Sequence, residues 1–176
     1  MEFTKYNHSI EEKKIYDFWE KSDLFKPRAK KSKKTFSIVI PPPNITGRLH
    51  MGHALNNSLQ DVLIRYYRMN GFETLWQPGT DHAGIATQAI VEKNLLKENI
   101  HKNDIGREKF IEKVWEWKTE SGGLILEQLK KLGCSCDWSR SRFTMDYEMS
   151  KAVTKVFVAL FNKKLIYKDK KLVNWD

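Results

Sequence analysis

The chain has 176 residues, a length that predicts about one folded domain with a real core. Its apolar content of 40% and aromatic content of 12% exclude a disordered protein. The formal net charge of +9 favours an anionic partner such as a nucleotide or a nucleic acid.

The sequence shows no sign of export or of a membrane contact. No apolar signal region is found at the N-terminus, and no apolar run approaches the ~20 residues of a membrane span. Cys134 and Cys136 are the only cysteines, too few for a disulfide framework or a complete zinc site. We therefore expect a cytoplasmic protein with no metal-binding residues, in which the two thiols are structural and not half of a metal site.

The first 34 residues predict an N-terminal helix and a basic connector. Apolar side chains between Ser9 and Leu24 recur among charges at the spacing of an amphipathic helix. From Lys26 to Lys34, six residues of nine are basic. This run is either a solvated connector, the interpretation we favour, or an arm that contacts phosphate.

The segment from residue 35 to residue 84 predicts a strand, a helix and a second strand. Thr35–Ile40 is a nearly continuous apolar run, typical of a buried parallel strand. Apolar residues at helical spacing then lead to Asn70-Gly71, which predicts the helix end. Glu73–Trp76 predicts the next strand and Gln77–Gly84 a loop. This order indicates an α/β fold with a doubly wound parallel sheet.

The remaining chain predicts mainly helices. Ile85–Lys97 is expected to form one helix, and Asp146 to cap the last one. Between them we expect a helix capped by Asp104 that breaks at Gly122-Gly123 and resumes over 124–132. At the C-terminal end, a hairpin is predicted from two short apolar runs, Leu165–Tyr167 and Leu172–Trp175.

The most informative segment is Pro41–Ala54. His50 and His53 flank Gly52 directly after the predicted strand and before the predicted helix, so both imidazoles are expected on the first helical turn. Backbone N–H groups without intrahelical partners make such a helix start a good anion site, and a glycine there lets a ligand approach the backbone. The arrangement predicts a nucleotide triphosphate site without a covalent nucleophile. Helix capping or core packing is the alternative interpretation of the two histidines.

Four strings make the chain resemble the valyl-tRNA synthetases, a family of class I aminoacyl-tRNA synthetases. His50–His53 is similar to the class's first signature, His-x-Gly-His. The other strings are Pro41–Asn44, Trp76–Gln88 and Leu172–Asp176. The isoleucyl and leucyl relatives look like Gly-Trp-Asp where this chain has Gly79–Asp81.

The resemblance implies a valine–tRNA ligase, which activates valine with ATP and Mg²⁺ and transfers it to tRNA(Val). It implies that His50 and His53 are catalytic and contact ATP phosphates, and that Gly52 admits the nucleotide. Asn44 and Thr46 are weaker candidates for ATP binding.

The same resemblance implies part of an amino-acid pocket. Asp81 would accept the α-amino group of valine, with the Pro41 carbonyl and an apolar wall near Pro42 beside it. Asp81 could instead cap the following helix. His82 could contact ligand or only brace the loop that presents Asp81.

The resemblance also implies that the chain is incomplete. Residues 35–176 match the first half of a Rossmann-like catalytic domain, while the editing, second-signature and anticodon-binding regions are absent. Lys30–Lys34 matches the second signature, Lys-Met-Ser-Lys-Ser, at three of five positions, but it precedes the first signature and is interpreted as coincidence. We expect no activity from this chain alone and expect the remainder of a synthetase as its partner. The alternatives are a non-catalytic nucleotide- or RNA-binding fragment and a small stand-alone nucleotidyltransferase.

Some aromatic and basic residues have two interpretations. Trp115, Trp117 and Trp138 could stack on RNA bases, but burial against helices is the favoured interpretation. Arg140 and Arg142 could contact the tRNA acceptor end, or could be ordinary solvated side chains.

Overall fold

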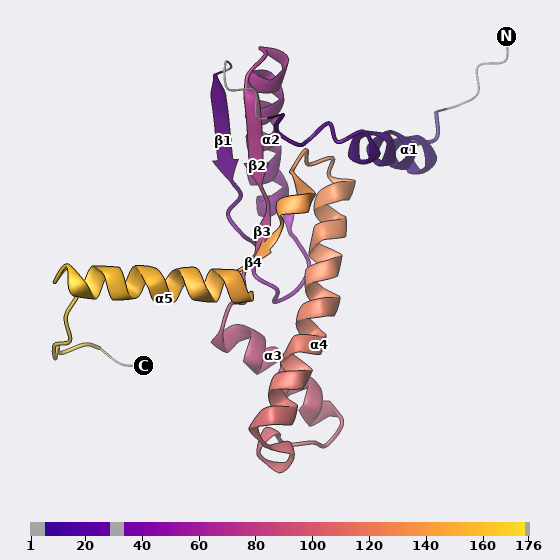
Figure 1. Cartoon of the computed structure of the whole chain (residues 1–176). Helices are drawn as coiled ribbons and strands as arrows, with labels where there is room; N and C mark the ends of the chain where they lie inside the picture. The colour runs from indigo at the N-terminus through magenta and orange to yellow at the C-terminus, as the bar shows by residue number, and fades with distance from the viewer. Residues whose placement is uncertain (1–5, 29–33, 175–176) are drawn as a thin grey trace, which may run out of the picture.

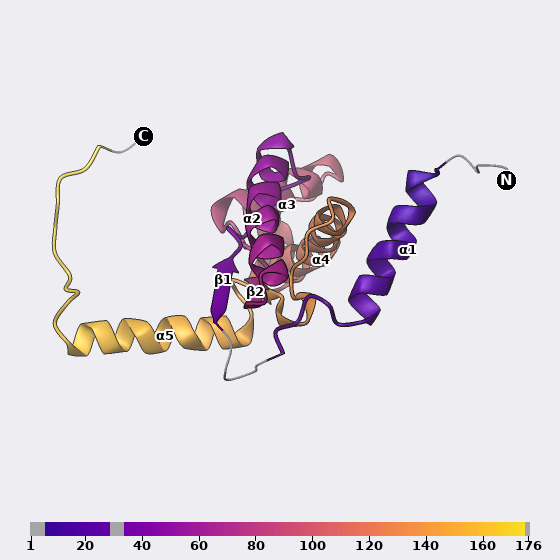
Figure 2. The same cartoon turned by 90° about the horizontal axis from the view of Figure 1, so that it is seen from above.

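The structure is a computed structural model that describes residues 6–28 and 34–174. In chain order, its helices and strands are α1 (His8–Lys21), β1 (Thr35–Val39), α2 (Met51–Met69), β2 (Glu73–Gln77), β3 (Gly79–Thr80), α3 (Ile85–Lys97), α4 (Lys102–Lys131), the short 3-10 helix η1 (Trp138–Arg140), β4 (Arg142–Phe143) and α5 (Tyr147–Asn162). The strands form a central body with α2, α3 and α4, from which α1 and α5 extend on opposite sides (Figures 1 and 2).

Two pairs of parallel strands form the sheet structure. β1 pairs with β2, with Thr35 opposite Glu73, and α2 is the helical crossover between them. β3 pairs in parallel with β4 within the segment predicted as a loop, with Gly79 opposite Arg142. Parallel strands joined by helices agree with the predicted α/β class.

The prediction that the first strand is fully buried is wrong. Alternate residues of β1 are exposed, and Val39 retains 73% of its accessible surface. Phe36 and Ile38 pack toward the core on one face of the strand. In the described part of the chain β1 pairs along one edge only and is covered by α2 on one face, so it has the alternating pattern of a half-buried strand.

The core lies where α2, β2 and α4 meet. Trp76, Ile64 and Leu129 are completely buried there. Cys134 and Cys136 belong to the same cluster as free thiols, and burial raises the pKa of Cys134 to about 12. These contacts favour the structural interpretation of the cysteines. Among the described residues, no three His, Cys, Asp or Glu side chains gather as a possible metal site.

The polar face of α2 is turned inward. Asp61 Oδ1 accepts hydrogen bonds from the Ser135 backbone N–H at 3.0 Å and the Ser135 hydroxyl at 2.6 Å, and Oδ2 binds Arg65 Nε at 2.6 Å. Arg65 also donates to the Gly133 carbonyl at 2.8 Å. The apolar stripe of the helix therefore faces outward, with exposed side chains at Leu55, Leu59, Val62, Leu63, Tyr66 and Met69.

The predicted break in α4 is wrong. Gly122 and Gly123 stay helical, and the backbone departs from helical geometry only at Gly106, where φ is 75°. Gly122 is buried, and the neighbouring Ser121 hydroxyl donates to the Ile45 carbonyl at 3.0 Å. These tertiary contacts outweigh the low helix propensity of glycine.

The two predicted helix caps differ in outcome. Asp146 caps α5 as expected, because its carboxylate accepts the Met149 N–H at 2.8 Å. Asp104 is not the N-cap of α4: it is the third helical residue, and His101 occupies the cap position. The Asp104 carboxylate instead accepts the His101 N–H at 3.3 Å.

The predicted C-terminal hairpin is also wrong. Residues 163–174 contain no strand, and Trp175 lies outside the described residues. An isolated two-stranded hairpin is marginal in water, and few contacts support one here. α5 itself has no buried residue. None of the helices in the described part of the chain is long and apolar enough to cross a bilayer.

Candidate functional site

His50 and His53 form a reciprocal cap at the start of α2. His50 is the N-cap residue, and its Nδ1 accepts the Gly52 backbone N–H at 3.1 Å. The His50 backbone N–H in turn donates to His53 Nδ1 at 3.2 Å. The two ring centroids are 4.0 Å apart. The structure thus brings the two predicted histidines together on the first helical turn, and the capping interpretation is correct as a description of their geometry.

Capping leaves the outer nitrogen of each ring available. Because each Nδ1 accepts a backbone N–H, each neutral imidazole carries its proton on Nε2. Burial, and then the charge of the adjacent His50, lower the pKa of His53 and favour this neutral form. Among the described residues, neither Nε2 has a hydrogen-bond partner. The pair therefore offers two N–H donors beside the positive end of a helix dipole, where anions bind well.

Gly52 is required for this cap. A Cβ atom at Gly52 would lie 2.9 Å from His50 Cε1 and 3.1 Å from His50 Nδ1. A side chain there would therefore displace the ring from its capping position. This steric requirement adds to the predicted role of Gly52 in keeping the helix start open to a ligand.

The loop after β1 is joined to the Asp81 segment. Asp81 N–H donates to the Pro43 carbonyl at 2.8 Å, and Ile45 N–H donates to the Asp81 carbonyl at 3.0 Å. Asn44 and Asp81 consequently form an isolated parallel bridge. Three further predicted site residues, Pro41, Pro42 and Thr46, lie on the same loop, where the two prolines are exposed and Thr46 is half-buried.

Helix α4 fixes the other side of that loop. The carbonyl of the buried Ile45 accepts the indole N–H of Trp117 at 2.7 Å, and Leu49 N–H donates to Gln128 Oε1 at 3.0 Å. α4 thus supports the loop that leads into the histidine cap at two points, Ile45 and Leu49. No sequence signal identified Gln128 as part of this support.

Asp81 has one occupied and one open carboxylate oxygen. Oδ1 accepts the Thr144 hydroxyl at 2.9 Å and the Ala83 N–H at 3.3 Å. Within the described residues Oδ2 has no hydrogen bond, and 35% of the side chain is exposed. Helix α3 begins after Gly84 without a side-chain cap, so the alternative that Asp81 caps this helix is wrong.

His82 braces the loop. Its backbone N–H lies 2.9 Å and its Nδ1 2.6 Å from the Thr144 hydroxyl. Thr144 was not identified from the sequence, because it is 63 positions from Asp81 and reaches it only through the pairing of β3 with β4. No hydrogen bond, ion pair or ring contact in the described part of the chain links Asp81 or His82 to the histidine cap.

The tryptophans are mainly structural. Trp117 is held by Ile45, and the indole N–H of Trp138 donates to the Tyr16 hydroxyl at 2.7 Å. Trp115 remains 44% exposed and packs edge-on against Phe143. These contacts favour burial over base stacking for Trp117 and Trp138.

The basic candidates for RNA binding stay predictions. Arg140 Nε lies 3.2 Å from the buried Asp137 carboxylate, and Arg142 lies 3.8 Å from Asp146. Both arginine side chains are more than half exposed. Residues 29–33 of the basic run, including most of Lys30–Lys34, lie outside the described residues.

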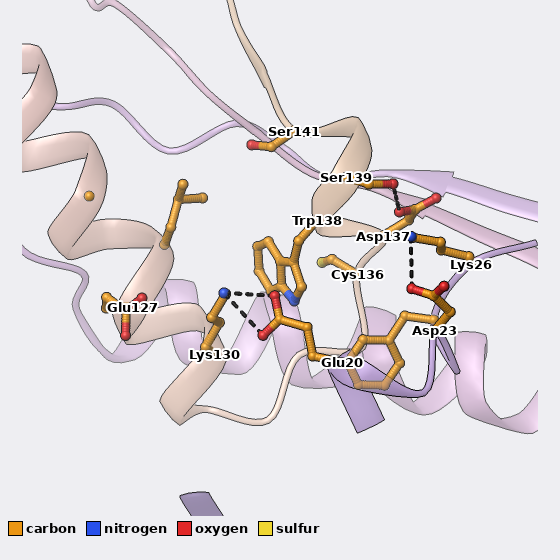
Figure 3. Close-up of a pocket in the computed structure, with 13 residues that line it drawn as sticks. Glu20, Asp23, Lys26, Glu127, Lys130, Cys136, Asp137, Trp138, Ser139 and Ser141 are labelled. Atoms are coloured by element: carbon orange, nitrogen blue, oxygen red, sulfur yellow. Dashed lines mark hydrogen bonds and ion pairs between the residues drawn. The ribbon is translucent and has the colours of Figure 1, made fainter. Parts of the chain in front are cut away.

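A cavity of about 470 Å³ lies between α1, α4 and the segment 136–141 (Figure 3). Four of its charged groups form two ion pairs, with Lys130 3.0 Å from Glu20 and Lys26 2.7 Å from Asp23. None of the residues predicted to bind ATP or the amino acid lines this cavity. The histidine cap and Asp81 therefore lie outside this cavity.

The fold is of the α/β class, and a helix start that presents N–H donors follows a parallel strand, an arrangement suited to binding anions. Residues 14–176 match the family model of the class I tRNA synthetases (I, L, M and V), and the chain belongs to this family. The resemblance seen in the sequence motifs is thereby confirmed.

Curated relatives narrow the similarity to valine–tRNA ligases. The chain is 73% identical to the valine–tRNA ligase of Pelagibacter ubique strain HTCC1062 over 172 residues, covering 98% of this chain and 19% of the relative. It is 61% identical to that of Mesorhizobium japonicum, covering 97% of this chain and 19% of the relative. The chain thus spans about a fifth of the length of these relatives.

A solved structure supports the fold. The LeuRS of Agrobacterium radiobacter K84, in a ternary complex with tRNA and LeuAMS, matches with a TM-score of 0.74 and 23% identity. The match covers 94% of this chain and 19% of that one.

Proposed function

We propose that this chain forms the ATP-binding segment and part of the valine pocket of a valine–tRNA ligase acting in the cytoplasm. The observation that carries the proposal is the His50–His53 cap, which leaves two Nε2–H donors at a helix start. The identity of 73% to a valine–tRNA ligase over 98% of the chain supports the choice of reaction and amino acid. Buried free thiols are consistent with a reducing compartment.

In the proposed reaction, a carboxylate oxygen of valine attacks the α-phosphorus of ATP, and pyrophosphate leaves. The substrate carboxylate is the nucleophile, so the protein supplies alignment and electrostatic stabilisation. His50 and His53 donate Nε2–H to phosphate oxygens, while Gly52 keeps the approach open. Asn44 and Thr46 offer further polar contacts from the preceding loop. The valyl group is then transferred to tRNA(Val).

Mg²⁺ enters this proposal with the triphosphate. It commonly binds through substrate phosphates and few protein carboxylates. Because the described residues offer no cluster of three or more metal-ligating side chains, we assign no residue of this chain to the ion.

Asp81 holds the amino acid in this proposal. Its open Oδ2 accepts the valine ammonium in a charge-assisted hydrogen bond. The Pro41 carbonyl and the exposed ring of Pro42, on the loop bridged to Asp81, form a further part of the pocket.

We further infer that residues 35–176 are the first half of a doubly wound, Rossmann-like domain that works with the remainder of a synthetase, and that residues 1–34 precede this domain. The exposed apolar stripe of α2 and the absence of buried residues in α5 support the need for a partner. In the relatives, the remainder of the same polypeptide could be this partner, since this segment matches only 19% of their length.

Replacing both His50 and His53 with alanine tests the nucleotide site. Hydrogen bonds to a charged group contribute about 1.5–3 kcal/mol each, so losing both should weaken ATP binding at least ~10-fold in calorimetry. His8→Ala, at the exposed start of α1, is the control and should bind ATP like the parent chain. Equal ATP affinity in the folded double variant would exclude the histidine cap as the phosphate site.

A further inference from the structure

We propose that Thr144 is a positioning residue for amino-acid binding: its hydroxyl fixes the Asp81 carboxylate so that Oδ2 faces the substrate ammonium. This inference rests on the proposed role of Asp81. It adds Thr144, the residue directly after β4, to an amino-acid pocket that the sequence motifs confined to residues 41–81.

The directions of the hydrogen bonds around the Thr144 hydroxyl follow from its neighbours. The hydroxyl lies 2.9 Å from Asp81 Oδ1, 2.9 Å from the His82 backbone N–H and 2.6 Å from His82 Nδ1. A backbone N–H can only donate and an ionised carboxylate can only accept. The single hydroxyl hydrogen therefore goes to Asp81, and His82 donates through both its backbone N–H and its Nδ1–H. One donor and two acceptor positions are then all in use.

This arrangement determines which oxygen of Asp81 is open. Oδ1 is occupied by Thr144 and by Ala83 N–H, whereas the partly exposed carboxylate keeps Oδ2 for a ligand. His82 Nδ1 also lies 3.2 Å from Oδ1, farther than its 2.6 Å contact with the hydroxyl. Without the hydroxyl, the ring N–H of His82 would lose its nearer partner and turn to Oδ1, and the carboxylate would lose the contact that sets its orientation.

Thr144 is itself held by the pairing of β3 with β4. Its backbone N–H donates to the Thr80 carbonyl at 3.1 Å. At Gly79 a Cβ would lie only 2.8 Å from the Arg142 carbonyl oxygen, so the two strands approach as closely as they do because residue 79 is glycine. The hydroxyl is thus placed before substrate arrives, which is the requirement for a preorganised site.

The experiment uses a full-length enzyme in which this chain replaces the matching segment of the Pelagibacter ubique relative. Valine-dependent pyrophosphate exchange is measured for Thr144→Val, which removes the hydroxyl but keeps the shape, and for Thr144→Ser, which keeps the hydroxyl. Thr144→Val should raise the KM for valine about 10-fold while the KM for ATP changes less than about 2-fold, and Thr144→Ser should restore most of the valine KM. Thr119→Val removes an exposed α4 hydroxyl that bonds only the Trp115 carbonyl and should leave both KM values unchanged.

Asp81→Asn separates failure of this inference from failure of the proposed function. An unchanged valine KM in Asp81→Asn would refute the proposed role of Asp81 itself. If Asp81→Asn raises the valine KM but Thr144→Val does not, or if Thr144→Ser fails to rescue, only the Thr144 inference is overturned. In the Asp81→Asn background, Thr144→Val should have no further effect on the valine KM, because the two side chains act as one unit.

A second measurement needs neither activity nor the rest of the enzyme. In this chain, ring ¹⁵N shifts of His82 should report the proton on Nδ1, and Thr144→Val should change that signature while circular dichroism stays the same. Thr144→Ala replaces the valine variant if the latter does not fold. A His82 signature that is identical in the parent and in a folded variant lacking the hydroxyl would contradict the inferred hydrogen-bond directions.

Discussion

At the start of α2, each imidazole uses its two nitrogens for different tasks. Nδ1 of His50 and Nδ1 of His53 satisfy backbone N–H groups, as a capping box does. Each Nε2–H is left as a donor. Capping and ligand binding are therefore compatible, although the sequence presented them as alternatives.

His53 should titrate below an ordinary histidine, whose pKa is ~6.5. Burial first, and then the charge of His50, lower the pKa of His53. Because the folded state disfavours the proton, this contribution to stability is present above the unfolded pKa and is lost as the pH falls through the folded pKa. An NMR titration of the His53 ring measures this directly.

The His50→Ala variant is the matched control for that titration. It removes the neighbouring ring and its charge, so the His53 midpoint should move upward toward ~6.5. A parent midpoint at or above ~6.5 would show that His53 is not held neutral by this cap.

For individual residues, the sequence predicts contacts only between side chains that lie close together along the chain. His50, Gly52 and His53 fall within one helical turn, and the structure places them there. The contact between Asp81 and Thr144 depends on two short parallel strands whose pairing no local pattern indicates. Thr144 was missed for that reason.

Among the helices and strands, α5 is the one whose stability depends most on interactions within its own sequence. It has no buried residue, so tertiary packing contributes little and its N-cap matters more. Asp146 accepts the Met149 N–H at 2.8 Å, and backbone hydrogen bonds, chiefly this one, lower the pKa of Asp146.

Asp146→Ala should therefore increase amide hydrogen exchange in the first turn of α5. Asp146→Asn, which keeps a capping oxygen, should retain most of the protection, and Glu148→Ala in the same turn is a control that leaves the cap intact. In the parent, protection should fall as the pH drops through the lowered pKa of Asp146, because the carboxylate form makes the cap. Exchange that is the same in the parent and in Asp146→Ala would show that the cap does not hold this helix.

Element ends were predicted best where a local stop or cap determines them. Asn70-Gly71 ends α2 as predicted, and α3 spans the predicted residues. Gly122-Gly123 failed as a break because the buried side of α4 packs against Ile45, a contact between residues 76 positions apart. The C-terminal hairpin failed because two short apolar runs do not form a stable hairpin without a surface to cover.

On the scale of the whole molecule, the sequence motifs identified the family, and the structure shows how they are assembled. The loop after β1 carries five of the predicted site residues between Pro41 and His50, and it is held by Asp81 on one side and α4 on the other. The apolar stripe of α2 faces outward, although a helix with such a stripe usually buries it. The apolar spacing predicted the helix correctly, but the stripe is not buried, because no described residue covers it.

The central claim is that this chain supplies the ATP-binding segment of a valine-activating enzyme and needs the remainder of a synthetase to act. Valine-dependent pyrophosphate exchange tests it most directly, measured for this chain alone, for the remaining part of the Pelagibacter ubique relative alone, and for the two joined in one polypeptide. We predict no exchange from either part, exchange from the joined enzyme, and a loss of at least ~100-fold when the joined enzyme carries His50→Ala and His53→Ala. Robust exchange by this chain alone, or a folded joined enzyme that is inactive or indifferent to the histidine substitutions, would contradict the account.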